Sequence, residues 1–183
     1  MEAQFNIQDA SQARIMILMR GLPSCGKTYT SRKLARAGGA HIEFDQFFYT
    51  QMGADPNSYD WSEQELSNAR NWNLERIKAA VDEGVSPIIV DSDNTVCGFT
   101  KQYVVYAVER GYEIQFKDPE SPWWRTIRQL LDNRESNARE LRAWAGILTT
   151  LSESMHRVPL QAILQRIERW KSDITCEDIL AAE

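Results

Sequence analysis

The chain has 183 residues and carries 21 basic and 26 acidic side chains, which gives a formal net charge of −5. This length suits one domain with a substantial core, and the 43% of apolar residues excludes a wholly disordered chain. No stretch approaches the roughly 20 apolar residues that a membrane-spanning helix needs, and the first residues lack the basic-then-apolar order of a signal peptide. The three cysteines form neither a CxxC pair nor an even set, so we expect a reducing, cytoplasmic location and no membrane association.

Short apolar runs alternate with amphipathic segments along the first two thirds of the chain. The predicted strands are Arg14–Met19, His41–Phe44, Pro87–Val90 and Tyr112–Phe116. The predicted helices are Tyr29–Ala37, Ser62–Val81 and Lys101–Arg110, and beyond Pro122 the pattern is helical to about Lys171. Strands that alternate with helices predict an α/β fold with a mostly parallel sheet and helices on both of its faces.

The segment between the first strand and the first helix reads Gly21-Leu-Pro-Ser-Cys-Gly-Lys-Thr28, which matches the pattern G-x-x-x-x-G-K-[ST]. Its glycines let successive N–H groups converge on phosphate oxygens at the positive end of a helix dipole. In this pattern Lys27 reaches the β- and γ-phosphates and the Thr28 hydroxyl binds Mg²⁺. A tight turn that contains these residues by chance is the alternative. We assign nucleotide contacts to the loop and the residue after it: Gly21, Leu22, Pro23, Ser24, Cys25, Gly26, Lys27, Thr28 and Tyr29.

Cys25 admits two interpretations. A helix N-terminus lowers the pKa of a thiol, which would make this cysteine sensitive to oxidation. Alternatively, it is a small residue that fits the loop.

Acidic residues follow two of the predicted strands. Asp45 comes after the second strand and Asp91 ends the third. Side chains at the carboxyl edge of a parallel sheet point into the crevice where ligands bind. Asp45 can there accept the proton of an attacking hydroxyl, and Asp91 can hold Mg²⁺ directly or through water. Whether Asp91 or Asp93 faces the metal stays open. The alternative for Asp45 is a structural role, as the cap of a turn or helix.

The chain lacks the N-K-x-D motif with which a GTPase reads its base. Small P-loop kinases instead carry a helical lid with arginines, which stabilise the negative charge of the transferred phosphoryl group. The arginines of the helical C-terminal third that could do this are Arg125, Arg128, Arg134, Arg139 and Arg142. Of these we select Arg128 and Arg134 as catalytic candidates.

Three segments together resemble the polynucleotide-kinase branch of the P-loop kinases: the phosphate loop, Phe44-Asp-Gln-Phe-Phe48, and Ile88-Ile-Val-Asp-Ser-Asp-Asn94. The resemblance implies a three-layer P-loop sandwich with a C-terminal helical lid, and ATP-dependent phosphorylation of a 5′-hydroxyl. It assigns Asp45 to the acceptor hydroxyl and places Asp91 and Asn94 at the ends of the relatives' D-N-T-N motif. Where close relatives have a glycine before the last helix this chain has Arg157, which becomes a further candidate for nucleotide contact.

We therefore expect one kinase domain over residues 1–183, with a core at about 12–122 and a lid at about 123–183. Its cofactors are ATP and Mg²⁺, and its acceptor is the 5′-hydroxyl of a polynucleotide or short oligonucleotide. Two alternatives stay open. The acceptor is a small metabolite, as in sugar-nucleotide kinases of the zeta-toxin type, or the domain is an ATP-binding switch or adaptor that phosphorylates nothing. The acidic middle of the chain favours a small acceptor or a short oligonucleotide.

Overall fold

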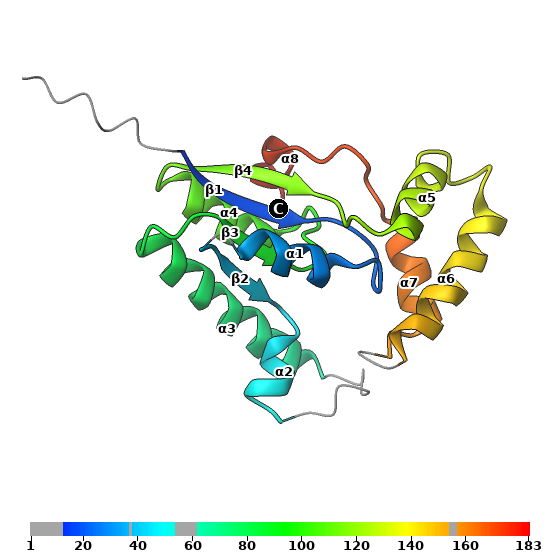
Figure 1. Ribbon diagram of the computed structural model, residues 1–183, viewed down its shortest axis with the longest axis horizontal. Coiled ribbons are helices and arrows are strands. Elements are labelled where there is room, and N and C mark those ends of the chain that lie inside the picture. The colour runs from blue at the N-terminus through cyan, green and yellow to red at the C-terminus, as the bar shows by residue number, and fades with distance from the viewer. Residues whose placement is uncertain (1–12, 37, 54–61, 154–156) are drawn as a thin grey trace, which may run out of the picture.

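The computed structural model describes residues 13–36, 38–53, 62–153 and 157–183 (Figure 1). Its strands are β1 (Arg14–Met19), β2 (Ala40–Glu43), β3 (Ile88–Asp91) and β4 (Tyr112–Lys117). The helices of the first two thirds are α1 (Lys27–Ala35), α2 (Gln46–Thr50), α3 (Glu63–Asp82) and α4 (Gly98–Val108). The remaining helices are α5 (Pro122–Leu131), α6 (Ala138–Ser152), α7 (Leu160–Glu168) and α8 (Cys176–Leu180).

All the strand pairs of the sheet are parallel, and the strand order is β2-β3-β1-β4. The central strand β3 is buried along its whole length, as its uninterrupted apolar interior predicts. The chain moves one way across the sheet through α1 and the other way through α3 and α4, so right-handed crossovers place α1 on one face and the other two helices on the opposite face (Figure 1). This arrangement confirms the predicted α/β fold, and it gathers the carboxyl ends of the strands at one edge.

The helix boundaries follow local signals where such signals exist. Ser62 caps α3 with a full capping box, because its side chain accepts from the Glu65 N–H and the Glu65 carboxylate accepts from the Ser62 N–H. The short helices α2 and α8 were not predicted, since five residues give too little periodicity to detect. None of the helices in the described ranges combines the length and apolarity that crossing a membrane requires.

The main core lies between the sheet and the layer formed by α3, α4 and α8. Ile77 of α3 and Val104 of α4 are fully buried there, against Ile88 of β3. Ile179 of α8 joins the same cluster, so the segment after the lid returns to the core and packs against α4. The C-terminus therefore lies beside the sheet, away from the lid (Figure 1).

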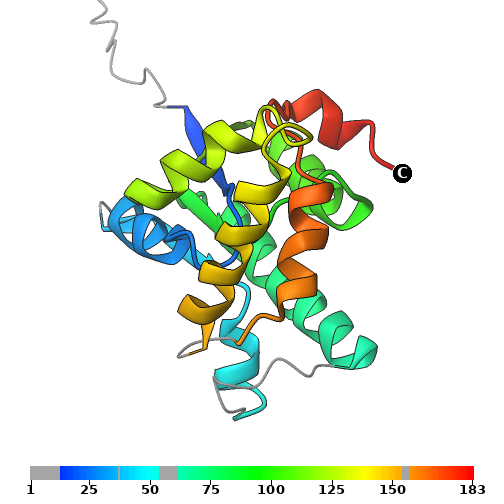
Figure 2. The ribbon, with the colours of Figure 1, turned by 90° about the vertical axis from the view of Figure 1, so that its right-hand side faces the viewer.

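The lid consists of α5, α6 and α7, which stand together beyond the carboxyl edge of the sheet (Figures 1 and 2). It has its own apolar core, in which Trp124 and Trp170 make an edge-to-face contact with ring centroids 5.2 Å apart. Leu22 and Cys25 of the phosphate loop are buried in this core. The lid therefore packs directly on the loop that it is expected to cover.

Two neighbouring residues of α6 test this second core. Leu148 is fully buried in it, whereas Ile147 is 47% exposed. We expect Leu148→Ala to lower the free energy of unfolding by about 2–5 kcal/mol, because it removes packed methyl groups and leaves a cavity. The matched change Ile147→Ala should cost no more than about 0.5 kcal/mol. Urea unfolding followed by circular dichroism measures both; equal effects of the two changes would contradict the packing described for α6.

Candidate nucleotide and acceptor site

A cavity of about 640 Å³ opens at the carboxyl edge of the sheet, between the phosphate loop, α3 and the lid. This volume falls within the range of small-molecule sites in proteins. Most of the residues that the sequence nominates line it: Pro23, Ser24, Gly26, Lys27, Thr28, Tyr29, Asp45 and Asp91. Asp93, which the sequence left open as an alternative to Asp91 beside the metal, lines it as well. So do Arg70 and Arg166, which the sequence pattern did not select for the site.

The phosphate loop takes the strained path that its glycines predict. Gly26 caps α1 with φ +88°, and Ser24 has φ +59°, so the loop alternates into left-handed conformations that create concave sets of N–H groups. Gly21 has φ +142°, and a side chain there would meet Pro119 at 2.9 Å. Glycine is therefore required at position 21 for steric as well as conformational reasons.

Two residues at the start of α5 hold the loop in place. The Ser121 hydroxyl donates to the carbonyl of Cys25 at 2.8 Å, and the Trp123 indole N–H donates to the carbonyl of Ser24 at 3.1 Å. Burial raises the pKa of the Cys25 thiol to about 12, so this thiol is neutral near pH 7. The interpretation of Cys25 as a small residue that fits the loop is favoured over that of a reactive thiolate.

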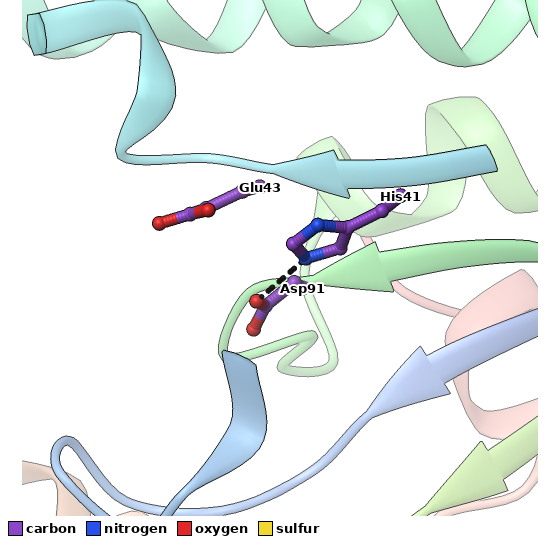
Figure 3. Close-up of side chains that lie close together, drawn as sticks. All are labelled: His41, Glu43 and Asp91. Atoms are coloured by element: carbon purple, nitrogen blue, oxygen red, sulfur yellow. Dashed lines mark hydrogen bonds and ion pairs between the residues drawn. The ribbon is translucent and has the colours of Figure 1, made fainter. Parts of the chain in front are cut away.

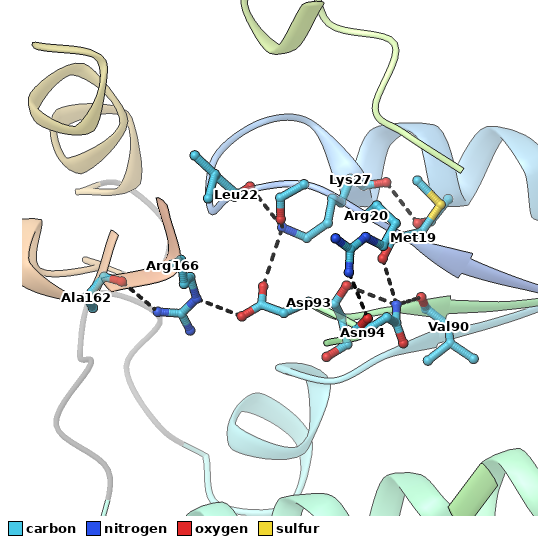
Figure 4. A network of polar contacts seen from close by, with 12 residues as sticks. Met19, Arg20, Leu22, Lys27, Val90, Asp93, Asn94, Ala162 and Arg166 are labelled. Carbon is cyan, nitrogen blue, oxygen red and sulfur yellow. Dashed lines mark hydrogen bonds and ion pairs between the residues drawn. The ribbon is translucent and has the colours of Figure 1, made fainter. Parts of the chain in front are cut away.

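Lys27 and Arg166 meet at one carboxylate (Figure 4). The Lys27 ammonium donates to the carbonyls of Gly21 at 3.0 Å and Leu22 at 2.9 Å, and it lies 3.8 Å from Asp93. Arg166 of α7 donates to Asp93 at 2.7 Å. Burial alone would raise the pKa of Asp93, but Arg166 and Lys27 outweigh it and hold that pKa below its ordinary value. Two cations from the loop and the lid thus share one anion in the cavity.

The segment that carries Asp93 is fixed by a buried amide (Figure 4). The Asn94 side chain donates to the carbonyls of Met19 at 2.8 Å and Val90 at 2.9 Å, and it accepts from the Tyr103 hydroxyl at 2.7 Å. Arg20 donates to the Asn94 carbonyl at 3.1 Å. These bonds join the ends of β1 and β3 to α4, which gives Asn94 a structural role beside the site.

Asp91 is buried at the end of β3 and lies 3.0 Å from the Nε2 atom of His41 on β2 (Figure 3). The possible ligand atoms of His41, Glu43 and Asp91 lie within 4.8 Å of one another. The hydrogen bond to the imidazole can fix the orientation of the carboxylate, as outer partners of metal ligands do. Carboxylate and hydroxyl oxygens suit Mg²⁺, so the Asp91 and Thr28 side chains, which line the same cavity, fit that ion.

Asp45 directly precedes α2, and side chains of α3 bond to the residue on each side of it. Asn73 of α3 donates to the carbonyl of Phe44 at 3.1 Å, and Arg76 donates to the side chain of Gln46 at 2.7 Å. The first bond fixes the peptide group before Asp45, and the second fixes the side chain of the residue after it. The carboxylate that is expected to act as a base therefore stands on rigid support beside α3.

The structure does not bring Arg128 or Arg134 to the cavity. Arg128 donates to the hydroxyl of Ser172 at 3.0 Å and to its carbonyl at 3.3 Å. Arg134 donates to the carbonyl of Ile167 at 3.1 Å and to that of Glu168. Both side chains satisfy main-chain oxygens at and beyond the end of α7, where a helix leaves carbonyls without partners. In this structure they hold the lid together.

Arg157 also lies away from the cavity lining and is exposed. Its backbone N–H donates to the carbonyl of Ser152 at 2.8 Å, and its φ is +43°. A left-handed backbone is favourable for glycine, which gives a physical reason for the glycine that close relatives are expected to have at this position.

The parallel sheet, the phosphate loop and the helical lid define a P-loop kinase-like domain. The chain belongs to the AAA_33 family, described as an AAA domain, which it matches over residues 16–154. It is 31% identical over 113 residues to human NEDD4-binding protein 2, a match that covers 61% of this chain and 6% of that protein. It is 23% identical over 179 residues to human YLP motif-containing protein 1, covering 86% of this chain and 8% of that protein. The chain thus spans less than a tenth of either relative.

Two solved structures share the fold. One is the Pnkp1/Rnl/Hen1 RNA repair complex, with a TM-score of 0.56 and 16% identity over 92% of this chain and 46% of that one. The other is a protein of Chloroflexus aurantiacus classed among kinases, with a TM-score of 0.51 and 18% identity over 85% of this chain and 78% of that one. At these identities the likeness concerns the fold alone.

Proposed function

We propose that this domain is an ATP-dependent kinase that transfers the γ-phosphate to the 5′-hydroxyl of an oligonucleotide or polynucleotide. One observation carries the proposal. A single cavity holds the loop lysine, the ion pair between Asp93, which follows β3, and Arg166 of the lid, and the carboxylate of Asp45. Phosphoryl transfer requires cations that bind the triphosphate and a base that accepts the proton of the attacking hydroxyl. An RNA repair complex among the structures that share the fold supports a nucleic-acid acceptor.

The residues divide the chemistry as follows. Lys27 and the loop N–H groups bind the β- and γ-phosphates, and Arg166 stabilises the charge on the transferred group. The acceptor hydroxyl gives its proton to the Asp45 carboxylate while its oxygen forms a bond to the γ-phosphorus. The bond from that phosphorus to the bridging oxygen breaks, and ADP leaves with the electron pair. Thr28 and Asp91 would hold Mg²⁺, which neutralises phosphate charge when bound.

A small acceptor is the second candidate, and the cavity gives it one specific argument. Carboxylates contribute strongly to the lining: Glu43, Asp45, Asp91 and Asp93. A long polyanion meets repulsion at such a surface, whereas a short 5′-end or a sugar nucleotide presents few phosphates to it.

Transfer of radiolabelled γ-phosphate to a panel of acceptors tests the proposal. The panel contains 5′-hydroxyl DNA and RNA oligonucleotides, nucleosides and sugar nucleotides. We expect label on the oligonucleotide 5′-ends. Label on sugar nucleotides alone would establish the small-acceptor function instead. ATP binding without transfer to any acceptor would contradict both and favour a nucleotide-binding switch.

A further inference from the structure

Among the described residues, three lysine and arginine side chains line the cavity, and they differ in the contacts that they make. Lys27 and Arg166 both contact Asp93, as described above. Arg70 of α3 lines the same cavity, and within the described ranges of the chain it forms no ion pair with a carboxylate. The guanidinium group of Arg70 can therefore bind an anionic ligand without first giving up a carboxylate partner, whereas Lys27 and Arg166 both contact Asp93.

Arg70 belongs to the half of the cavity that contains Asp45. Leu66, Ala69 and Arg70 line the cavity from successive positions of one helical face. One turn further along this helix, Asn73 bonds the carbonyl of the residue before Asp45. The first half of α3 thus lies beside the proposed base, on a different element from the lid that supplies Arg166.

A second arginine of α3, Arg76, differs from Arg70 because contacts within the protein hold it in place. Arg76 donates to the side chains of Gln46 and Asn73 and stacks on the Trp72 ring at 4.3 Å. Its donors are used within the protein. Arg70 is exposed, makes no such contact in the described part of the chain, and is one of the residues that line the cavity.

Two carboxylates that line the cavity have partners other than Arg70. Glu43 pairs with Arg32 at 3.2 Å, and Asp91 pairs with His41. A guanidinium group offers a planar set of donors that matches the oxygens of a phosphate group. Phe48 and Leu66 supply apolar surface beside it, which suits the sugar or base that would carry that phosphate.

We infer that Arg70 binds a phosphate group of the acceptor itself, so that the site selects hydroxyl acceptors that already carry a phosphate. This inference rests on the proposed kinase function. The phosphate comes either from the nucleotide that follows a nucleic-acid 5′-end or from a phosphorylated small metabolite. Both offer Arg70 the same chemistry, and the experiment separates them.

The test compares acceptors that differ by phosphate. One pair is adenosine 3′-monophosphate and adenosine; the other is a sugar nucleotide and its free sugar. For the pair that serves as substrate, Arg70→Ala should lower kcat/KM for the phosphorylated member by about 10- to 100-fold and alter the unphosphorylated member by less than about twofold. Arg70→Lys should recover part of the loss. Arg36→Ala removes an exposed arginine just after α1, outside the cavity lining, and should leave both values unchanged.

An equal loss for both members of a pair, or no loss for either, would overturn the role of Arg70. Equilibrium binding keeps this result separate from the kinase proposal. With the donor site filled by a non-hydrolysable ATP analogue, Arg70→Ala should raise the Kd of the phosphorylated acceptor at least about 10-fold. An unchanged Kd overturns the inference. A raised Kd without transfer by the parent protein supports the inference while the kinase proposal fails.

Discussion

The Asp45→Asn variant is expected to lose phosphoryl transfer by about 10²- to 10⁴-fold in kcat, which is the usual contribution of a general base. An amide has nearly the shape of a carboxylate but cannot accept the proton of the attacking hydroxyl. The bonds that flank this position come from Asn73 and Arg76 and do not involve the Asp45 carboxylate, so the fold of the segment should persist. ATP affinity should stay at the parental value, because the proposed triphosphate contacts lie on the loop and the lid.

Steady-state transfer and equilibrium ATP binding measure these two quantities in the same preparation. Asp173→Asn is a matched control, since that side chain is 98% exposed on the segment after α7. It makes the same chemical change outside the cavity lining and should transfer phosphate as the parent does. An Asp45→Asn protein as fast as the control would show that Asp45 is not the base.

Much of the fold could be predicted from the sequence, because its signals are local. The apolar run Pro87–Val90 identifies β3, and Ser62 with Glu65 identifies the start of α3. The phosphate loop is equally local, since the left-handed residues at Ser24 and Gly26 belong to one turn between a strand and a helix. Such features depend on neighbours in the chain, which the sequence displays directly.

The charge partners of the lid could not be predicted in this way. Arg128 and Arg166 lie on amphipathic lid helices, and Arg134 lies in the turn between α5 and α6. Their local sequence does not show which of the three reaches the cavity. The tertiary packing decides that the first two meet main-chain oxygens at and beyond the end of α7 and that the third reaches Asp93. Arg70 was missed for the same reason, because its place in the cavity lining follows from how α3 packs against β2.

Replacing Arg166 by alanine is expected to have the largest effect on catalysis. Arginines that stabilise the transferred phosphoryl group contribute about 10³- to 10⁵-fold to kcat in P-loop enzymes. We expect a loss in this range for Arg166→Ala. Arg166→Lys should recover little, because a point charge does not reproduce the planar donor geometry of a guanidinium group. Arg169→Ala, at an exposed position after the same helix, is the control.

The pairing of Arg166 with Asp93 adds a pH dependence whose sign follows from the lowered pKa of Asp93. A carboxyl group with a lowered pKa in the folded state stabilises that state above its ordinary pKa of 3.8, and this contribution is lost as the pH falls through the lowered value. Between about pH 5 and pH 8 the contribution of the ion pair to the free energy of unfolding should therefore be constant. Parent and Asp93→Asn proteins should then differ in stability by a constant amount over this range, and their difference should shrink only in acid.

The same series decides between Arg166 and the arginines chosen from the sequence. If Arg166→Ala keeps kcat within about threefold of the parent, Arg166 does not stabilise the transferred phosphoryl group, since that role supplies about 10³-fold or more. The variants Arg128→Ala and Arg134→Ala should then be compared by kcat and by urea unfolding together. Loss of stability without loss of kcat per folded molecule is the result that their main-chain contacts predict. Loss of kcat at unchanged stability would instead mean that the lid rearranges when nucleotide binds and brings one of these arginines to the phosphate.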